Sequence, residues 1–329
     1  MAYYAFWQKK NSLIGKILSP LGFLYALSVR LRFKRTKPFQ VSVPVICVGN
    51  LSVGGTGKTP VCIAISKILT KLNQPFFFLN HGYKGKERNV MVSKTHTAVD
   101  VGDEALLFAS LAPTVVDNKR ARGAQLAVKK GAKCIIMDDG FQNPSLIKTL
   151  SFVVVDGKQG FGNNRVLPAG PLREPVLRGL QRADAVIIAG EDTAGVEFYL
   201  KRNQIDLPVF KGRFVLNEKI IQELRGKDIY AFAGLGQPEK FFDSLTNAGL
   251  SVTDKHCFPD HYAYSRFDIE DILAKAGSKA VATTEKDAIK IQKDLLKSVY
   301  VVDGQFVFDE EPAVVNFLQG VLNGNDSSI

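Results

Sequence analysis

The sequence predicts an α/β fold in which a parallel sheet carries helices on both faces, followed by a second, smaller α/β lobe and preceded by a basic amphipathic helix. Short β-branched runs alternate with helix-patterned segments along most of the chain. That alternation stops at about residues 190–225, where glycines and a proline are scattered, and then resumes. Alternating strands and helices favour a parallel sheet with right-handed crossovers.

The first 40 residues carry eight Lys or Arg and no acid. Ser19 is a possible N-cap with Pro20 following it, and Phe23, Leu24, Leu27 and Leu31 then fall on one helical face. The uncharged stretch 17–29 is shorter than the roughly 20 residues needed to span a bilayer. We expect a helix that either lies in a membrane interface or packs on the protein's own core.

The strands and helices of the first lobe follow one another at short intervals. Runs typical of strands cover 41–48, 75–79, 114–116, 134–137, 152–155 and 185–188, and helical patterns cover 59–72, 101–112 and 120–130. After a connector with a possible β-ribbon at 209–216, strands are expected at 229–233, 280–283 and 299–302, and helices at 238–248 and 267–276. The predicted divisions are 1–35 for the N-terminal helix, 36–205 for the larger domain and 206–329 for the smaller lobe.

Composition limits the class of protein and its partners. The chain has 329 residues, 46% of them hydrophobic, which is enough for two cores and argues against disorder. A net charge of +11 favours an anionic partner, whether nucleotide, nucleic acid or acidic lipid. The four cysteines lack paired spacing, as expected of reduced core thiols, and the four histidines lack the spacing of metal ligands.

The residues Ser52-Val53-Gly54-Gly55-Thr56-Gly57-Lys58-Thr59 stand between the first expected strand and the first long helix. In such a P-loop, backbone N–H groups surround phosphates at a helix N-terminus, the lysine reaches the terminal phosphates and the hydroxyl binds Mg²⁺. Ser52 replaces the usual first glycine, but the strand and helix supply the context. The sequence therefore predicts a P-loop NTPase-type fold that binds ATP and Mg²⁺ through Gly54, Gly55, Thr56, Gly57, Lys58 and Thr59.

Acidic residues occur at two further places where this chemistry needs them. Asp138 and Asp139 close a buried strand, the position at which P-loop proteins place a magnesium-orienting acid, although an exposed turn is the alternative. Asp103 and Glu104 open a helix, where acids also serve simply as capping groups.

Four other motifs allow a functional and a structural interpretation. His261 follows Pro259 and Asp260 in what is also a simple turn, and the Pro-rich loop 167–175 carries the pair Arg173 and Glu174 that either faces an anionic substrate or lies in solvent. The segment 234–238 resembles half of a dinucleotide fingerprint but also suits a tight turn into a helix. Thr284 and Asp287 have the spacing of a capping box.

Together and in this order, the motifs resemble the tetraacyldisaccharide 4'-kinase (lipid A 4'-kinase) family. The resemblance runs from about residue 12 to residue 290 and rests on 49–60, 102–104, 138–142, 167–175, 232–238, 260–261 and 283–287. It implies an ATP-dependent lipid kinase of lipid A biosynthesis, which phosphorylates the 4'-hydroxyl of a tetraacyldisaccharide 1-phosphate at the cytoplasmic face of the bacterial inner membrane. The implied partners are that lipid and the membrane surface, with no nucleic acid and no obligate protein partner inferred.

The resemblance also implies residue roles and two lobes that close over nucleotide. Lys58 and Thr59 hold phosphates and Mg²⁺, Glu104, Asp138 and Asp139 assist the metal, and Asp103 with His261 forms the acid/base pair. Asn50, Arg173 and Glu174 line the substrate site. One departure is His81, which stands where the family usually has arginine, so that a phosphate contact there is weaker and pH-dependent.

Two other functions remain open at this stage. A nucleotide-switch ATPase or GTPase acting on protein or metal partners uses a similar loop, often with a lysine where this chain has Val53. A membrane-recruited binding module without catalysis is the third. A switch protein releases free phosphate from ATP, whereas the lipid kinase moves it to a lipid.

Overall fold

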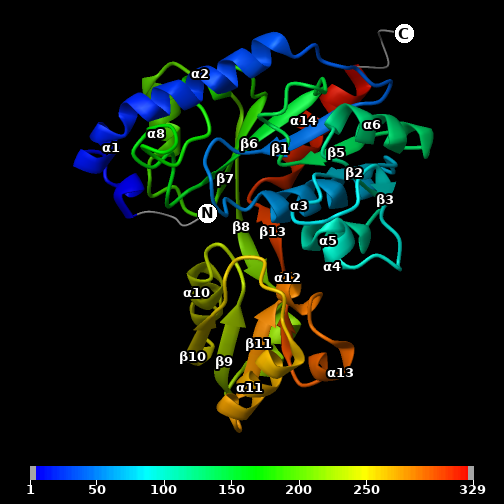
Figure 1. Cartoon of the computed structure of the whole chain (residues 1–329), viewed down its shortest axis with the longest axis vertical. Helices are drawn as coiled ribbons and strands as arrows, with labels where there is room; N and C mark the ends of the chain where they lie inside the picture. Colours follow the sequence, from blue (N-terminus) through cyan, green and yellow to red (C-terminus); the bar gives the residue numbers. More distant parts are fainter. Residues whose placement is uncertain (1–4, 325–329) are drawn as a thin grey trace.

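The computed structural model describes residues 5–324, and these form a larger and a smaller lobe stacked along the long axis of the molecule (Figure 1). What the sequence predicts for residues 1–4 of the basic segment and for the end of the chain from 325 lies outside the described residues. The predicted α/β class with parallel sheets is confirmed in both lobes.

Within residues 5–324, nine strands form the larger sheet in the order β13-β8-β7-β6-β1-β5-β2-β4-β3. Neighbours are parallel except at the two edges, where β13 pairs antiparallel with β8 and β3 with β4. The strands are β1 (Val45–Gly49), β2 (Phe77–Asn80), β3 (Val90–Met91), β4 (Thr114–Val116), β5 (Ile135–Asp138), β6 (Leu150–Asp156), β7 (Ala185–Ala189), β8 (Val209–Leu216) and β13 (Gly304–Phe308). β1, which leads into the P-loop, lies between β5 and β6.

Helices cover both faces of this sheet because successive residues of its central strands point to opposite sides and both sides are apolar. Ile46 and Ile136 face one cluster, whereas their neighbours Val45 and Ile135 face the other. The first cluster includes α3 (Lys58–Lys71), α5 (Asp103–Ala109) and α14 (Glu311–Gly324). The second includes α6 (Arg120–Lys129), α7 (Val176–Leu180) and α8 (Val196–Arg202), and the short α4 (Ala98–Val101) precedes α5.

The smaller lobe is built on a four-stranded parallel sheet in the order β10-β9-β11-β12. Its strands are β9 (Asp228–Ala233), β10 (Ser251–Cys257), β11 (Ala280–Thr284) and β12 (Tyr300–Val302). Its helices are α9 (Glu218–Leu224), α10 (Glu239–Asn247), α11 (Arg266–Ala276), α12 (Glu285–Ala288) and α13 (Lys293–Leu296). Phe242 on α10 and Ile272 on α11 are fully buried in the two cores that flank the sheet.

The division of the strands between the two sheets does not follow the predicted domain boundary between residues 205 and 206. β8 pairs with β7, and β13 returns beside β8, so both belong to the larger sheet. Phe306 and Phe308 of β13 pack in the same core as α3 and α14. The four-stranded sheet therefore uses only residues 228–302, and the chain crosses between lobes twice. The division into domains that fold or move separately stays a prediction.

The basic N-terminal segment contains a 3-10 turn at Ala5–Gln8, α1 (Leu13–Ile17) and α2 (Ser19–Arg35). Ser19 is not the N-cap that the sequence suggests: Ser12 caps α1, and the Ser19 hydroxyl donates to the Gly15 carbonyl because α1 runs almost directly into α2.

The apolar face of α2 points away from the core. Phe23 is 69% exposed and Leu24 is 59% exposed, and Leu27 and Leu31 are exposed as well. The alternative in which this face packs on the protein's own core is therefore wrong. Gly22, on another face, is buried, with its Cα beside the Val166 carbonyl. α2 lies across the end of the larger lobe that is remote from the smaller lobe (Figure 1).

Candidate active site

The candidate site lies at the carboxyl edge of the larger sheet, where open parallel sheets bind ligands. The P-loop leaves β1 and enters α3 at Gly57, whose φ of 89° is left-handed and suits glycine. Within the loop, the buried Asn50 side-chain amide donates to the Thr56 hydroxyl at 3.0 Å. Among the residues that the structure describes, no side chain caps the N-terminus of α3, so its first N–H groups are available to an anion. The predicted strand, loop and helix around Gly54–Thr59 are present.

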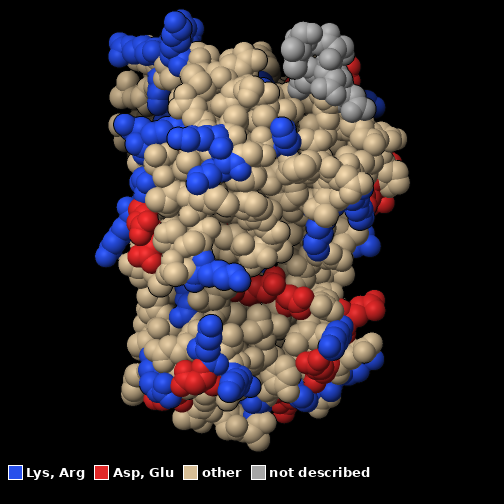
Figure 2. Space-filling model, turned by 90° about the vertical axis from the view of Figure 1, so that its right-hand side faces the viewer, with Lys and Arg blue, Asp and Glu red and all other residues tan. Residues whose placement is uncertain are grey.

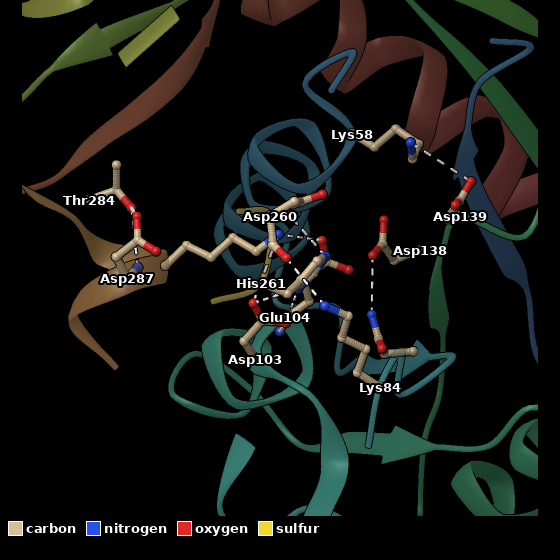
Figure 3. A network of polar contacts seen from close by, with 12 residues as sticks. Lys58, Lys84, Asp103, Glu104, Asp138, Asp139, Asp260, His261, Thr284 and Asp287 are labelled. Atoms are coloured by element: carbon tan, nitrogen blue, oxygen red, sulfur yellow. Dashed lines mark hydrogen bonds and ion pairs between the residues drawn. The ribbon is translucent and has the colours of Figure 1, made fainter. Parts of the chain in front are cut away.

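Asp139 sits among cations beside this loop. Its carboxylate accepts two hydrogen bonds from Arg173, at 2.8 and 3.1 Å. It also lies 3.9 Å from the Lys58 ammonium (Figure 3). Burial by itself raises the pKa of Asp139, but Lys58 and Arg173 outweigh it and hold that pKa well below its usual range. Asp139 is therefore ionised, and it holds Lys58 at the mouth of the loop.

Asp138 has a different environment from its neighbour. It is buried at the end of β5, where it accepts from the Asn80 amide at 3.1 Å and lies 3.6 Å from the Cys62 sulfur. Burial and the nearby carboxylates of Glu104 and Asp139 raise the pKa of Asp138 to about 7. The exposed-turn alternative is wrong for this residue, because a buried acid among acids is a position that a cation stabilises.

The Pro-rich loop 167–175 supports the P-loop from outside. The Val53 N–H donates to the Pro171 carbonyl at 2.8 Å, and the Arg173 N–H donates to the Leu51 carbonyl at 2.7 Å. Arg173 then reaches Asp139, so it faces the candidate site. Glu174 is buried and pairs with Arg182, with both carboxylate oxygens 2.8 Å from the guanidinium.

The two lobes bring Asp103 and His261 together although 158 positions separate them. The His261 Nδ1 lies 2.9 Å from one Asp103 oxygen and 3.0 Å from the other (Figure 3). Asp103 begins α5, where one of its oxygens accepts from the Glu104 N–H at 3.0 Å, and its carboxylate is almost fully buried. Burial raises the pKa of Asp103, but the hydrogen bond from His261 and the charge of Lys286 outweigh burial, so the pKa is lower than normal. Capping alone therefore does not account for Asp103.

His261 is fixed from both lobes. Its backbone has a left-handed φ of 59°, and its N–H donates to the Gly234 carbonyl at 3.2 Å. Its ring lies 5.0 Å from the Tyr83 ring of the larger lobe, centroid to centroid. The Gly234 N–H in turn donates to the buried Asp287, to which the Thr284 hydroxyl also donates at 2.8 Å. Of the predicted capping box, the structure has the N-cap, in which Thr284 accepts from the Asp287 N–H. The segment 234–238 is thus a tight turn that positions His261.

The sequence did not single out several residues of this region. Lys286 lies 3.2 Å from Glu104 and 4.0 Å from Asp103, and Asn80 joins Asp138 to the turn that follows β2. Arg120 is buried and donates to the Asp138 carbonyl at 2.8 Å. Asn80 could have been found from the sequence, because it is a polar residue directly after the apolar run of an expected strand. Lys286 has no such signal, and the motif that contains it was interpreted only as a helix cap.

His81 follows Asn80 at the end of β2. Burial and the cations Arg120 and Arg88 lower the pKa of its imidazole. The ring is therefore neutral at pH 7 and does not replace the charge of an arginine.

The donor set fits a magnesium ion brought in with phosphates. Among residues 5–324, no group of three or more His, Cys, Asp and Glu side chains is arranged to hold a metal by itself. Magnesium in phosphotransferases needs only one or two carboxylates, because water and substrate phosphates complete its shell. The buried Asp138 carboxylate and the nearby Glu104 fit this requirement.

The doubly wound sheet, the P-loop and the acids at the ends of neighbouring strands define a nucleotide-binding protein of the P-loop class. A family model described as tetraacyldisaccharide-1-P 4'-kinase matches residues 14–323, and the chain belongs to this family. It is 45% identical to the tetraacyldisaccharide 4'-kinase of Paramagnetospirillum magneticum over 309 residues, covering 92% of this chain and 94% of that one. It is 43% identical to the enzyme of that name from Rhodospirillum rubrum, covering 97% of each chain.

A solved structure agrees with these relatives. The crystal structure of the "apo" form of LpxK from Aquifex aeolicus in complex with ATP superposes with a TM-score of 0.76 at 29% identity, covering 94% of this chain and all of that one. Membership of a kinase family favours phosphoryl transfer over the nucleotide-switch alternative.

Proposed function

We propose that this protein transfers the γ-phosphate of ATP to the 4'-hydroxyl of a tetraacylated glucosamine disaccharide 1-phosphate, a lipid A precursor. One observation supports the proposal most: Asp103, held by His261, is the neighbour of Glu104, whose charge acts on Asp138 together with that of the P-loop Lys58. A phosphate cradle alone serves any nucleotide-binding protein. A positioned base beside it suits transfer to a hydroxyl group.

The residues then divide the work. The N–H groups of the P-loop and the start of α3 bind the phosphates, and Lys58 neutralises charge that develops on the transferred group. Thr59, Asp138 and Glu104, with Asp139 assisting, would hold a magnesium ion, which would shield the charges of the phosphates from one another. Asp103 accepts the proton of the attacking hydroxyl, while His261 fixes the orientation of its carboxylate.

A pocket beside the P-loop suits the sugar acceptor. It has a volume of about 410 Å³ and lies between α2, which contributes Tyr25 and Arg32, and the residues Val53, Gln142 and Arg173. Arg173 joins this pocket to Asp139. Asn50 lies just behind, since its carbonyl accepts from Gln142 at 2.8 Å. We propose that a glucosamine unit binds here, with Arg173 contacting substrate and with Asn50 and Glu174 supporting that surface.

The function is tested with ATP carrying a γ-phosphate label and a disaccharide 1-phosphate acceptor. We expect the label to move to a chloroform-soluble product that thin-layer chromatography resolves from the acceptor. Release of label only as free phosphate, at the same rate with and without the acceptor, would instead identify a nucleotide-switch protein.

We further propose that the N-terminal segment holds the enzyme on the cytoplasmic face of the inner membrane. Among the described residues, no helix is long and apolar enough to cross a membrane. α1 and α2 nevertheless expose Leu13, Ile17 and Phe23, each about 70% exposed, together with Leu24. Lys and Arg gather at the upper end of the molecule, where Figure 1 places α2 (Figure 2). Exposed apolar groups beside basic groups are typical of a helix in an anionic membrane interface.

Substitution of Leu13, Ile17, Phe23 and Leu24 by serine is expected to reduce co-sedimentation with anionic vesicles. The remaining attachment weakens with salt, since each basic residue near such a surface contributes roughly 1 kcal/mol that screening removes. The control is Phe267→Ser, which removes an equally exposed aromatic from the smaller lobe. Equal vesicle binding by the fourfold variant and the unaltered protein would contradict the proposal.

A further inference from the structure

The two lobes also meet beside the P-loop itself, through a lysine that the proposed mechanism does not use. Lys240 lies in the first turn of α10 in the smaller lobe. Its ammonium donates to the Gly55 carbonyl at 2.7 Å and pairs with the Asp156 carboxylate at the end of β6. One side chain of the smaller lobe thus contacts the phosphate-binding loop of the larger lobe directly.

Asp156 offers a rigid support for that lysine. It is buried, and one of its oxygens accepts from the N–H groups of Lys158 and Gln159, each at 2.9 Å. The side chains of Gln159 and Gln237 add a second link across the same junction, at 3.3 Å. Because the turn after β6 fixes the Asp156 carboxylate, this carboxylate holds the Lys240 ammonium in place. Lys240 in turn holds the Gly55 carbonyl.

The P-loop needs such an external contact because of its composition. Gly54 has a left-handed φ of 109°, and neither Gly54 nor Gly55 carries a side chain, so peptide groups here rotate at little cost. The C=O and N–H of a trans peptide point in opposite directions. An ammonium on the Gly55 carbonyl therefore determines on which side of the loop the Thr56 N–H lies, and in this structure that N–H donates to the Gly54 carbonyl at 3.2 Å.

We propose that Lys240 is a positioning residue of the nucleotide site, which orders the P-loop only when the smaller lobe is docked against it. The nature of the ligand rests on the proposed function, because the inference concerns ATP phosphates. Lys240 acts through the loop backbone and is not a catalytic residue. The consequence is that contact between the lobes supports nucleotide affinity as well as assembling Asp103 and His261.

The test is equilibrium binding of a non-hydrolysable ATP analogue with Mg²⁺ to the full chain, measured by calorimetry. Lys240→Met is expected to weaken binding by about tenfold, the effect of losing one charge-assisted hydrogen bond. Lys240→Arg retains the charge and most of the affinity. In turnover assays the methionine variant raises KM for ATP and leaves KM for the lipid acceptor unchanged, which a general loss of structure does not produce.

Lys255→Met is the matched control, since Lys255 pairs with Glu239 and lies over the Phe242 ring, both within the smaller lobe. It is expected to bind the analogue normally. Normal affinity in Lys240→Met, an equal loss in Lys255→Met, or no binding by the unaltered protein would each overturn the inference. The readout involves no lipid, so a failure of lipid phosphorylation with intact, Lys240-dependent binding would refute the proposed function alone.

Discussion

Lys58→Ala is expected to abolish most phosphoryl transfer while the protein remains folded. The Lys58 ammonium stands at the mouth of the P-loop, 3.9 Å from Asp139. In the transition state, charge spreads over the oxygens of the transferring group, and a preorganised cation there contributes more than in the ground state. Loss of one such group typically costs about 10² to 10³ in kcat, and we expect at least that from a radiolabel transfer assay.

The control for this substitution is Lys71→Ala, which removes an exposed lysine from the last turn of the same helix, where it pairs with Glu311. Both variants are expected to melt within a few degrees of the unaltered protein, because neither side chain belongs to an apolar core. Turnover by Lys58→Ala at the normal rate would remove the basis for placing ATP in this loop.

The larger sheet could be predicted because its signals are local. The apolar run before the P-loop, the helix that follows and the acids after Met137 each lie within a few residues, and the structure places all of them as expected. The contribution of β13 and α14 could not be predicted in this way. Residues 304–324 follow the smaller lobe in the chain, and only the pairing of β13 with β8 shows that they return to the larger one.

The candidate site shows the same limit. Motifs and family resemblance placed Lys58, Asp138 and Asp139 together, since adjacent parallel strands end at one edge. The partners of Arg173 and Glu174 could not be predicted from the sequence. The two residues are neighbours in the chain, but Arg173 contacts Asp139 whereas Glu174 pairs with Arg182. Ser19 was misjudged because α1, a helix of five residues, gives too weak a pattern to reveal that α2 is its continuation.

Asp103 and His261 are expected to act as one unit in catalysis. Their side chains touch across the two lobes, with the His261 Nδ1 2.9 Å from Asp103. Nδ1–H donates to the carboxylate, which also accepts from the Glu104 N–H at 3.0 Å, and a remaining lone pair can accept a proton from the sugar hydroxyl. Asp103→Ala and His261→Ala should each lower kcat by about 10² to 10⁴, the usual contribution of general acid–base groups. The control His256→Ala removes a histidine that packs on Phe258 within the smaller lobe, and it should leave kcat unchanged.

The double variant distinguishes a shared device from two separate ones. If His261 works only by holding Asp103, its removal has little left to affect once the carboxylate is gone, so the double variant should be scarcely slower than the slower single variant. Two independent groups would instead multiply their losses. His261→Gln should lower kcat less than His261→Ala does, because the glutamine amide can donate a hydrogen bond to the same Asp103 carboxylate. Multiplicative losses in the double variant, or normal kcat in His261→Ala, would mean that His261 is a turn residue beside a base that needs no help.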